Sequence, residues 1–211
     1  MPDHQVPAIL LLEDGTVCHG KAFGAVGTTA GEICFNTGMT GYQEVFTDPS
    51  YYGQILIMNT VHIGNYGVKD EDVESDNVKI RGLIGRNLED QYSRKLASGS
   101  LQDYLKANNI VSIEGVDTRA LVAHIRTKGA MNCIISSEIT DVDSLKSKLS
   151  EVPNMNGLEL ASHVSTKQAY ENGDRNSAIR IAVMDYGIKQ HILGCMVDRG
   201  ACSSAPADCG T

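Results

Sequence analysis

Two carboxylates and two glycines stand out in the nearly uncharged segment 35–51. Glu44 and Asp48 are four residues apart, a spacing that could pair them for general acid–base catalysis on one helical face. The proline that follows Asp48 predicts a turn there instead, which argues against such a dyad. Gly38 and Gly41 favour a loop whose backbone comes close to a ligand or partner, because glycine costs backbone entropy and packs nothing. A buried crossover loop that uses glycine for tight packing explains the segment equally well.

Cysteine thiols are the strongest nucleophiles in this composition. The chain has six of them, at Cys18, Cys34, Cys133, Cys195, Cys202 and Cys209. None belongs to a Cys-x-x-Cys pair, and no two histidines have zinc-binding spacing, so the sequence predicts no metal site. Reduced, dispersed thiols are therefore expected, with Cys18, Cys34 and Cys133 filling core positions.

Three histidines are candidate ligands or proton carriers. His62 and His124 lie among apolar neighbours, which favours hydrogen-bonded core or interface histidines over ligands. His191 is expected on the exposed side of a helix. The sequence contains no Gly-x-Gly-x-x-Gly run and no phosphate-binding loop, so it predicts no nucleotide-binding site by motif.

The composition is that of a globular protein. Of its 211 residues, 42% are hydrophobic and 21% are charged. A net charge of −8 and a pI near 5.2 argue against a nucleic-acid-binding surface, which needs concentrated basic residues. No stretch approaches the roughly 20 apolar residues of a membrane span. The first five residues lack the basic flank and apolar run of a signal peptide, so we expect a cytoplasmic protein without membrane contact.

The first half of the chain reads mainly as β-strands. Short apolar or alternating runs carry this prediction, and Asp14 and Gly15 predict a hairpin turn between the first two. The predicted strands cover residues 8–12, 16–23, 32–35, 54–59, 78–84 and 131–135.

Three helices are predicted from their capping residues. Ser100 precedes the first, and Asp117 and Asp141 precede the second and third. Gly129 is placed to end the second helix. Strands and helices mixed in this order predict an α+β fold for a domain covering residues 1–150.

A second unit is predicted after a linker at 151–178, where proline, asparagine and glycine are frequent. An apolar strand, the turn 185–187 and a helix that ends at Gly200 then follow, which is how a parallel α/β sheet begins. The residues after Gly200 read as a poor strand. One strand and one helix cannot bury their apolar faces alone, so the unit at 179–211 is predicted to be an incomplete domain.

Several motifs in order resemble one family. They are the Asn-Thr-Gly-Met-Thr-Gly-Tyr-Gln-Glu run at 36–44, with its continuation to residue 51, and the segments 61–65, 115–119, 128–132 and 183–189. Together they closely resemble the small, glutamine-using chain of carbamoyl phosphate synthetase, from residue 8 to about residue 200. The resemblance implies a β/β/α-type N-terminal domain followed by the first part of a class I glutamine amidotransferase domain.

The family resemblance also implies an activity and a partner. The small chain pairs with a large synthetase subunit as a heterodimer, and a Cys–His–Glu triad in its amidotransferase domain hydrolyses glutamine to release ammonia. The large subunit, a ligase, is expected to bind ATP and magnesium and to make carbamoyl phosphate for pyrimidine and arginine biosynthesis. No cofactor is expected in the present chain.

The sequence departs from this family at the nucleophile. The family places its catalytic cysteine in a Gly-x-Cys-x-Gly elbow, and none of the six cysteines has that flanking. Cys195 follows Gly194 but lies within a predicted helix. We therefore expect a chain truncated before the triad, with no catalytic residue. By resemblance, the wall of the glutamine pocket is expected to include Gly38, where the family often has serine, and Lys189. The alternative for Lys189 is a solvated surface lysine without a specific role.

Two other hypotheses remain open at this stage. The chain could be a free-standing, non-catalytic interaction module that uses the same N-terminal domain. Alternatively, the turn at 185–187 could belong to a nucleotide site in a small α/β protein. Both differ from the first hypothesis, in which the chain docks to the large subunit and supplies one wall of the glutamine pocket but does not hydrolyse glutamine alone.

Overall fold

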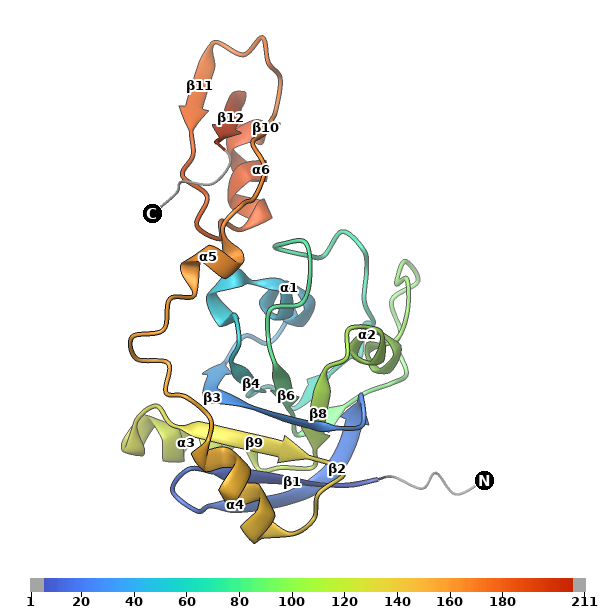
Figure 1. The fold of residues 1–211 in the computed structure, drawn as a ribbon. Coiled ribbons are helices and arrows are strands. Elements are labelled where there is room, and N and C mark those ends of the chain that lie inside the picture. The colour runs from blue at the N-terminus through green and yellow to red at the C-terminus, as the bar shows by residue number, and fades with distance from the viewer. Residues whose placement is uncertain (1–5, 207–211) are drawn as a thin grey trace.

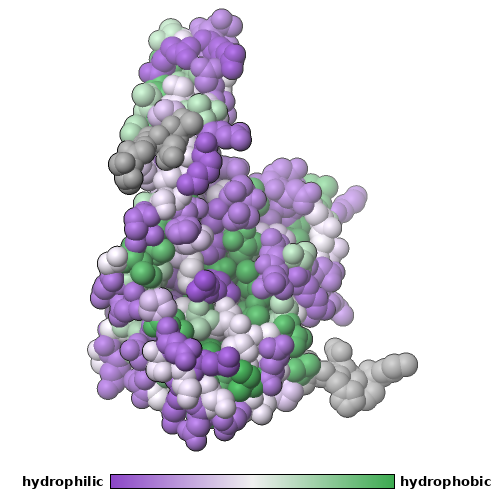
Figure 2. All heavy atoms as spheres, viewed as in Figure 1, coloured by the Kyte–Doolittle hydropathy of each residue, from purple (hydrophilic) through white to green (hydrophobic). Residues whose placement is uncertain are grey.

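A closed β-barrel and a separate small sheet make up the fold, as the computed structural model in Figure 1 shows. The structure describes residues 6–206. The expectations for residues 1–5 and for Cys209 lie outside them. We call residues 7–150 the barrel unit and residues 161–205 the C-terminal unit. In Figure 2 the C-terminal unit projects from the barrel unit as a narrow lobe.

The barrel closes through both parallel and antiparallel pairs, in the order β1-β2-β8-β6-β4-β3-β9. Antiparallel pairs join β1 to β2 and to β9, whereas β3, β4, β6 and β8 are parallel neighbours. Its strands are β1 (Pro7–Leu12), β2 (Val17–Gly24), β3 (Thr28–Asn36), β4 (Ile55–Met58), β6 (Gly82–Ile84), β8 (Val111–Glu114) and β9 (Asn132–Ser136). A separate short parallel pair is formed by β5 (His62–Ile63) and β7 (Asn87–Leu88).

The predicted hairpin between the first two strands is confirmed. Gly15 adopts a positive φ of 89°, and the backbone N–H of Thr16 donates to Asp14 Oδ1 at 3.0 Å. All six predicted strand segments contain a strand. The segment 78–84 pairs only over its last three residues. No strand was predicted at the positions of β5, β7 and β8.

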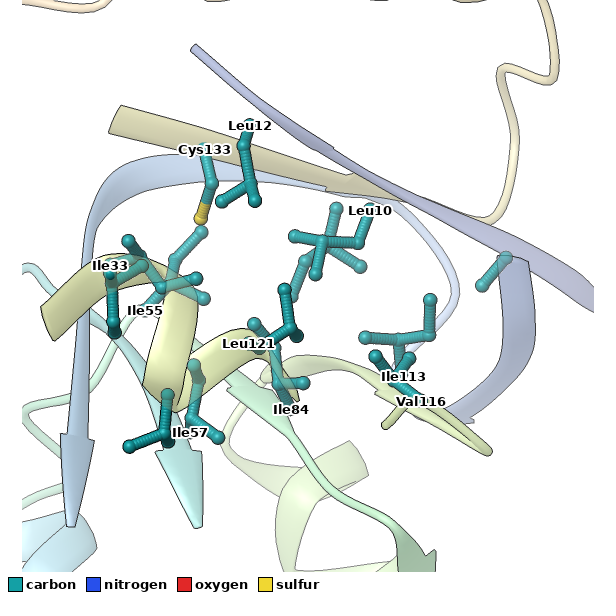
Figure 3. Close-up of a cluster of buried hydrophobic side chains, with 14 of the residues drawn as sticks. Leu10, Leu12, Ile33, Ile55, Ile57, Ile84, Ile113, Val116, Leu121 and Cys133 are labelled. Atoms are coloured by element: carbon teal, nitrogen blue, oxygen red, sulfur yellow. The ribbon is translucent and has the colours of Figure 1, made fainter. Parts of the chain in front are cut away.

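Alternation along β1 divides the hydrophobic core into an inner and an outer layer. Leu10 and Leu12 point into the barrel, where they pack with the inward residues of the other strands (Figure 3). Ile9 and Leu11 instead pack outside, under α4 (Val142–Ser150). This follows because successive side chains of a strand point to opposite faces. Helix α3 (Thr118–Lys128) contributes Leu121 to the inner cluster.

The three helix starts predicted from capping residues are confirmed. The Ser100 hydroxyl accepts the Asp103 N–H at 3.1 Å at the start of α2 (Leu101–Ala107). Asp117 and Asp141 accept backbone N–H groups in the same way at α3 and α4. Gly129 follows the last residue of α3, with a φ of 99°.

The glycine-containing segment 35–51 is only partly a loop. After residues 37–41, the chain forms α1 (Tyr42–Thr47), which the sequence reasoning did not anticipate, and then a 3₁₀ turn at Pro49–Tyr51. The predicted turn at Asp48 is therefore confirmed. Asp48 initiates it by accepting the backbone N–H of Ser50 at 2.9 Å.

The C-terminal unit contains more strands than predicted. Its elements are α5 (Ala161–Val164), β10 (Tyr170–Asn172), β11 (Ile179–Ala182), α6 (Gln190–Asp198) and β12 (Ala201–Ala205). The expectation of a poor strand after Gly200 is wrong, because β12 is the central strand, parallel to β11 and antiparallel to β10. Its small residues are mostly buried beside α6, so tertiary packing outweighs weak strand propensity.

The mixture of helices and strands agrees with the predicted α+β class. The segment 151–178, predicted as a linker, contains both α5 and β10, and the division into domains at 1–150 and 179–211 stays a prediction. Within residues 6–206, the helices are too short or too polar to cross a lipid bilayer.

Candidate functional site

The predicted pocket residue Lys189 lies where the two units meet. Its Nζ is 2.6 Å from Asp48 Oδ2, at the junction of α1 and the following 3₁₀ turn. The Asp48 side chain is only 7% exposed, whereas that of Lys189 is 41% exposed. The hydrogen bond to Asp48 raises the pKa of Lys189 despite partial burial, so the lysine stays charged.

The turn before Lys189 is built around Asp185. Its Oδ1 accepts the backbone N–H groups of Gly187 at 2.9 Å and Ile188 at 2.8 Å, and its Oδ2 accepts the Tyr170 hydroxyl at 2.9 Å. Burial, together with this bond to Asp185, raises the pKa of Tyr170 to about 12. The carboxylate therefore fixes the turn from both sides.

Gly187 allows this turn to press against the barrel unit. Its φ is 97°, and a Cβ there would come within 2.9 Å of Val164 and 3.0 Å of Pro49. A larger residue would have to displace one of these contacts, and it would also adopt a backbone conformation that side chains disfavour. The turn that carries Lys189 thus depends on glycine at this position.

Gly38, the other predicted pocket residue, is held by Asn36. Its N–H donates to Asn36 Oδ1 at 2.6 Å, and Asn36 Nδ2 donates to the Tyr51 hydroxyl at 3.0 Å. Tyr51 in turn is close enough to Lys189 to contribute to its raised pKa. Hydrogen bonds therefore connect Gly38 to Asn36 and Tyr51, and none between described residues joins Gly38 to Lys189 directly.

A cleft of about 720 Å³ separates the C-terminal unit from the barrel unit close to this junction. Carboxylates outnumber cations in its wall: Glu74, Asp76, Glu171 and Asp185 face Lys79 and Lys167. Neither Gly38 nor Lys189 lines this cleft. Lys189 lies in the chain between two lining residues, Ile188 and Gln190, but its own ammonium group pairs with Asp48.

One thiol lies beside an imidazole. Cys195 Sγ is 3.5 Å from His191 Nε2, one turn away along α6, and His191 is exposed as predicted. A thiol–imidazole pair is the core of many nucleophilic sites. Here the cysteine lies inside a helix, without the strand-to-helix elbow and flanking glycines of the resembled family.

The other cysteines are suited to packing. The described ones are all free, and Cys133 is fully buried in the barrel (Figure 3). Burial raises the pKa of Cys34 to about 12 and raises that of Cys133 strongly. A thiol that stays protonated is a poor nucleophile, so the predicted core-filling role fits the geometry of both.

The other two histidines singled out in the sequence, His62 and His124, each contact a single carboxylate. His62 lies 3.1 Å from Glu89, and His124 lies 2.7 Å from Asp14. Their predicted hydrogen bonding is confirmed, and because His62 is exposed, only the interface position stays a prediction for it. Among residues 6–206, no three His, Cys, Asp or Glu side chains are grouped so that they could hold a metal ion.

The sequence reasoning missed the partner of Lys189. Asp48 was considered as a turn residue and as a possible partner of Glu44, but not of Lys189, and Asn36 and Tyr51 were not singled out. One available signal was the helix after Lys189, which starts without a serine, threonine, aspartate or asparagine before it and so needs acceptors from elsewhere.

Comparison with known proteins identifies the family. A family model described as "Carbamoyl-phosphate synthase small chain, CPSase domain" matches residues 10–135. The carbamoyl phosphate synthase small chain of Aquifex aeolicus is 46% identical over 206 residues, which is 92% of this chain and 56% of the relative. That of Thermotoga maritima is 51% identical over 187 residues, covering 88% of this chain and 47% of the relative. The chain spans about half the length of such relatives. It belongs to the carbamoyl-phosphate synthase small chain family.

Proposed function

We propose that this chain is the small-subunit component of a glutamine-hydrolysing carbamoyl phosphate synthase in the cytoplasm. In this role it docks to the large subunit, a ligase that uses ATP and magnesium, and supplies one wall of the glutamine pocket. The product, carbamoyl phosphate, would serve pyrimidine and arginine biosynthesis. The matched family domain and the names of the relatives support the proposal.

The ion pair between Lys189 and Asp48 is the observation that carries the proposal. It brings together two segments on which the family resemblance rests, 36–51 and 183–189, although they are distant in the sequence. A lysine ammonium has three N–H donors, and one is used by Asp48. Because the side chain is 41% exposed, the others remain available to an anionic group such as the carboxylate of an amino acid.

Gly38 would contribute through its backbone. Glycine has no hydroxyl to offer, and its N–H is already donated to Asn36. Its carbonyl and the backbone of the exposed residues 37, 39 and 40 are what remains for a ligand, because the N–H and carbonyl of Gly41 are already used by Tyr66 and Val45. The proposal therefore assigns recognition of glutamine mainly to the lysine and only a supporting wall to the glycine.

Glutamine hydrolysis is not assigned to these 211 residues alone. The reaction needs an activated thiolate on an elbow where backbone N–H groups can stabilise the oxyanion. None of the six cysteines has that setting, including Cys195 beside His191. Purified protein is therefore expected to release no glutamate from glutamine. Glutamate release that persists in the Cys195→Ala variant would point to a contaminant, and release that the substitution abolishes would contradict the assignment.

Binding to the large subunit tests the proposal directly. The large subunit from the same organism is immobilised, and association of this chain is measured by surface plasmon resonance at micromolar concentrations. We expect saturable binding. A bovine serum albumin surface serves as the control, and absence of binding at these concentrations would contradict the proposal.

A further inference from the structure

Helix α6 lacks a capping side chain of its own. It begins at Gln190 after Lys189, whose side chain makes no capping hydrogen bond. The first backbone N–H groups of any helix have no partner within the helix. A lysine at this position cannot accept them, and its positive charge is unfavourable near the positive end of the helix dipole.

Glu74, from the barrel unit, supplies the missing acceptors. Its backbone carbonyl accepts the Gln190 N–H at 2.9 Å, and its carboxylate Oε2 accepts the His191 N–H at 3.0 Å. One residue, more than a hundred positions earlier in the chain, thus satisfies two consecutive donors. Its negative charge also complements the helix dipole at that end.

Glu74 is itself fixed to α1. Its N–H donates to the Thr47 hydroxyl at 2.9 Å, and the neighbouring Ser75 hydroxyl donates to the Thr47 carbonyl. Thr47 is buried and is the last residue of α1, directly before Asp48. Two adjacent residues of the barrel unit therefore hold the start of α6, one through Glu74 and the other through Lys189.

We infer that Glu74 is a positioning residue that caps α6 from the barrel unit and thereby sets the place of Lys189 against Asp48. The inference rests on the proposed function only in its consequence, that the glutamine pocket wall keeps its position relative to the barrel unit. The capping itself is a property of this chain and can be tested without glutamine or a partner.

Amide hydrogen exchange of α6, measured by NMR, provides the first test. Glu74→Ala removes the carboxylate, whereas Glu74→Gln keeps a side-chain oxygen acceptor at the same reach. In Glu74→Ala, we expect the His191 amide and the first turn of α6 to exchange about fivefold faster, since losing a cap costs about 1 kcal/mol. Glu74→Gln should exchange close to the unsubstituted rate.

A matched control comes from the same loop. Glu71 carries the same charge, is exposed and pairs with Lys69 at 2.6 Å. Glu71→Ala should leave α6 exchange unchanged. Barrel amides in β1 and β9 report on global stability. Unchanged α6 exchange in Glu74→Ala would overturn the inference, and so would equal acceleration in β1, β9 and α6.

The NMR signal of the Lys189 side-chain ammonium group can distinguish the positioning role of Glu74 from the recognition of glutamine by Lys189. In Glu74→Ala, this signal should broaden, because a loosened α6 no longer holds Lys189 on Asp48, and Glu74→Gln should restore it. An unaltered signal would contradict positioning of Lys189. Added glutamine tests the proposed function separately: if glutamine leaves Lys189 unmoved in the unsubstituted chain bound to the large subunit, glutamine recognition fails while the capping role of Glu74 stands.

Discussion

Tyr66 stacks on Tyr42 with ring centroids 4.3 Å apart, and its hydroxyl accepts the N–H groups of Gly41 at 2.7 Å and of Tyr42 at 3.2 Å. Because Gly41 has no side chain to cap α1, this phenol takes the place of a capping residue. The same connection of the chain that holds α6 through Glu74 therefore also holds α1 through Tyr66. Both helices that form the junction depend on residues 66–74.

We predict that Tyr66→Phe lowers the free energy of unfolding by about 1 kcal/mol, because it removes the acceptor for two backbone donors but keeps the ring stacking. Urea denaturation measures the change. Tyr186→Phe is a suitable control because Tyr186 is 54% exposed, and it should alter stability by much less. Equal stability of Tyr66→Phe and the unsubstituted chain would show that the hydroxyl does not cap α1.

The ion pair between Lys189 and Asp48 should weaken at high pH. The pKa of Lys189 is raised in the folded state, so its contribution is complete below the ordinary value of 10.5 and is lost as pH rises through the folded value. Since the lysine is partly exposed, solvent screening limits the coupling to about 1 kcal/mol or less.

A double-mutant cycle with Lys189→Met and Asp48→Asn measures that coupling. It should be favourable at neutral pH and should fall towards zero as pH rises past the raised pKa of Lys189. The exposed pair of Lys146 and Asp143, 3.7 Å apart, serves as a reference with weaker coupling. A coupling energy of zero at neutral pH would show that the ion pair between Lys189 and Asp48 does not stabilise the contact between the two units.

Glu44 should reduce stability at neutral pH. Desolvation raises its pKa above the ordinary value of 4.5, and its Oε2 is buried without a hydrogen-bond partner. A raised folded pKa means that the stabilising contribution exists in acid and is lost as pH rises through that pKa.

Glu44→Gln should therefore stabilise the protein at pH 7, by less than about 1 kcal/mol because the group is partly solvated. The difference should shrink towards zero below about pH 4, where glutamate is protonated. Thermal unfolding at both pH values checks this. A less stable variant at pH 7 would show that the carboxylate has a favourable partner in solution.

Local patterns in the sequence predicted much of this fold, whereas contacts between distant segments could not be predicted from them. Ser100, Asp117 and Asp141 were recognisable caps because the donor and acceptor are three residues apart. β12 was missed because its stability comes from pairing with both β10 and β11, which a run of small residues does not reveal.

In the candidate site, too, local motifs were recognisable in the sequence and the contacts between distant segments were not. Family motifs pointed to Lys189, but no local pattern could show that its partner is Asp48 or that Glu74 caps the following helix. These contacts join segments more than a hundred residues apart, so they exist only once the two units meet. Gly38 could be located by its motif, whereas its bond to Asn36 needed coordinates.

Gly38→Ser should disturb the loop that precedes α1. A Cβ at Gly38 would lie 2.9 Å from Asn36 Oδ1, so Asn36 would have to move away from the Tyr51 hydroxyl. We expect a loss of about 1 kcal/mol in stability and NMR shifts at Tyr51.

Gly194→Ser provides the control for the serine substitution, since a Cβ there meets no atom within 4 Å. Within α6 it should be neutral or slightly stabilising, because glycine is a poor helix former. If Gly38→Ser leaves the Tyr51 signal in place, Asn36 tolerates the added atom without shifting.

Because the barrel is closed, its strands cannot pair with those of another molecule at high concentration. A sheet that returns on itself offers no free strand to a neighbour, whereas the small sheet has two edge strands in the described part of the chain, β10 and β11, and Ile179 in β11 is 55% exposed. Hydrophobic patches interrupt the hydrophilic surface of that lobe (Figure 2). Self-association by strand pairing would therefore start at an edge of the small sheet, where the charged side chains of Glu171 in β10 and Arg180 in β11 oppose it.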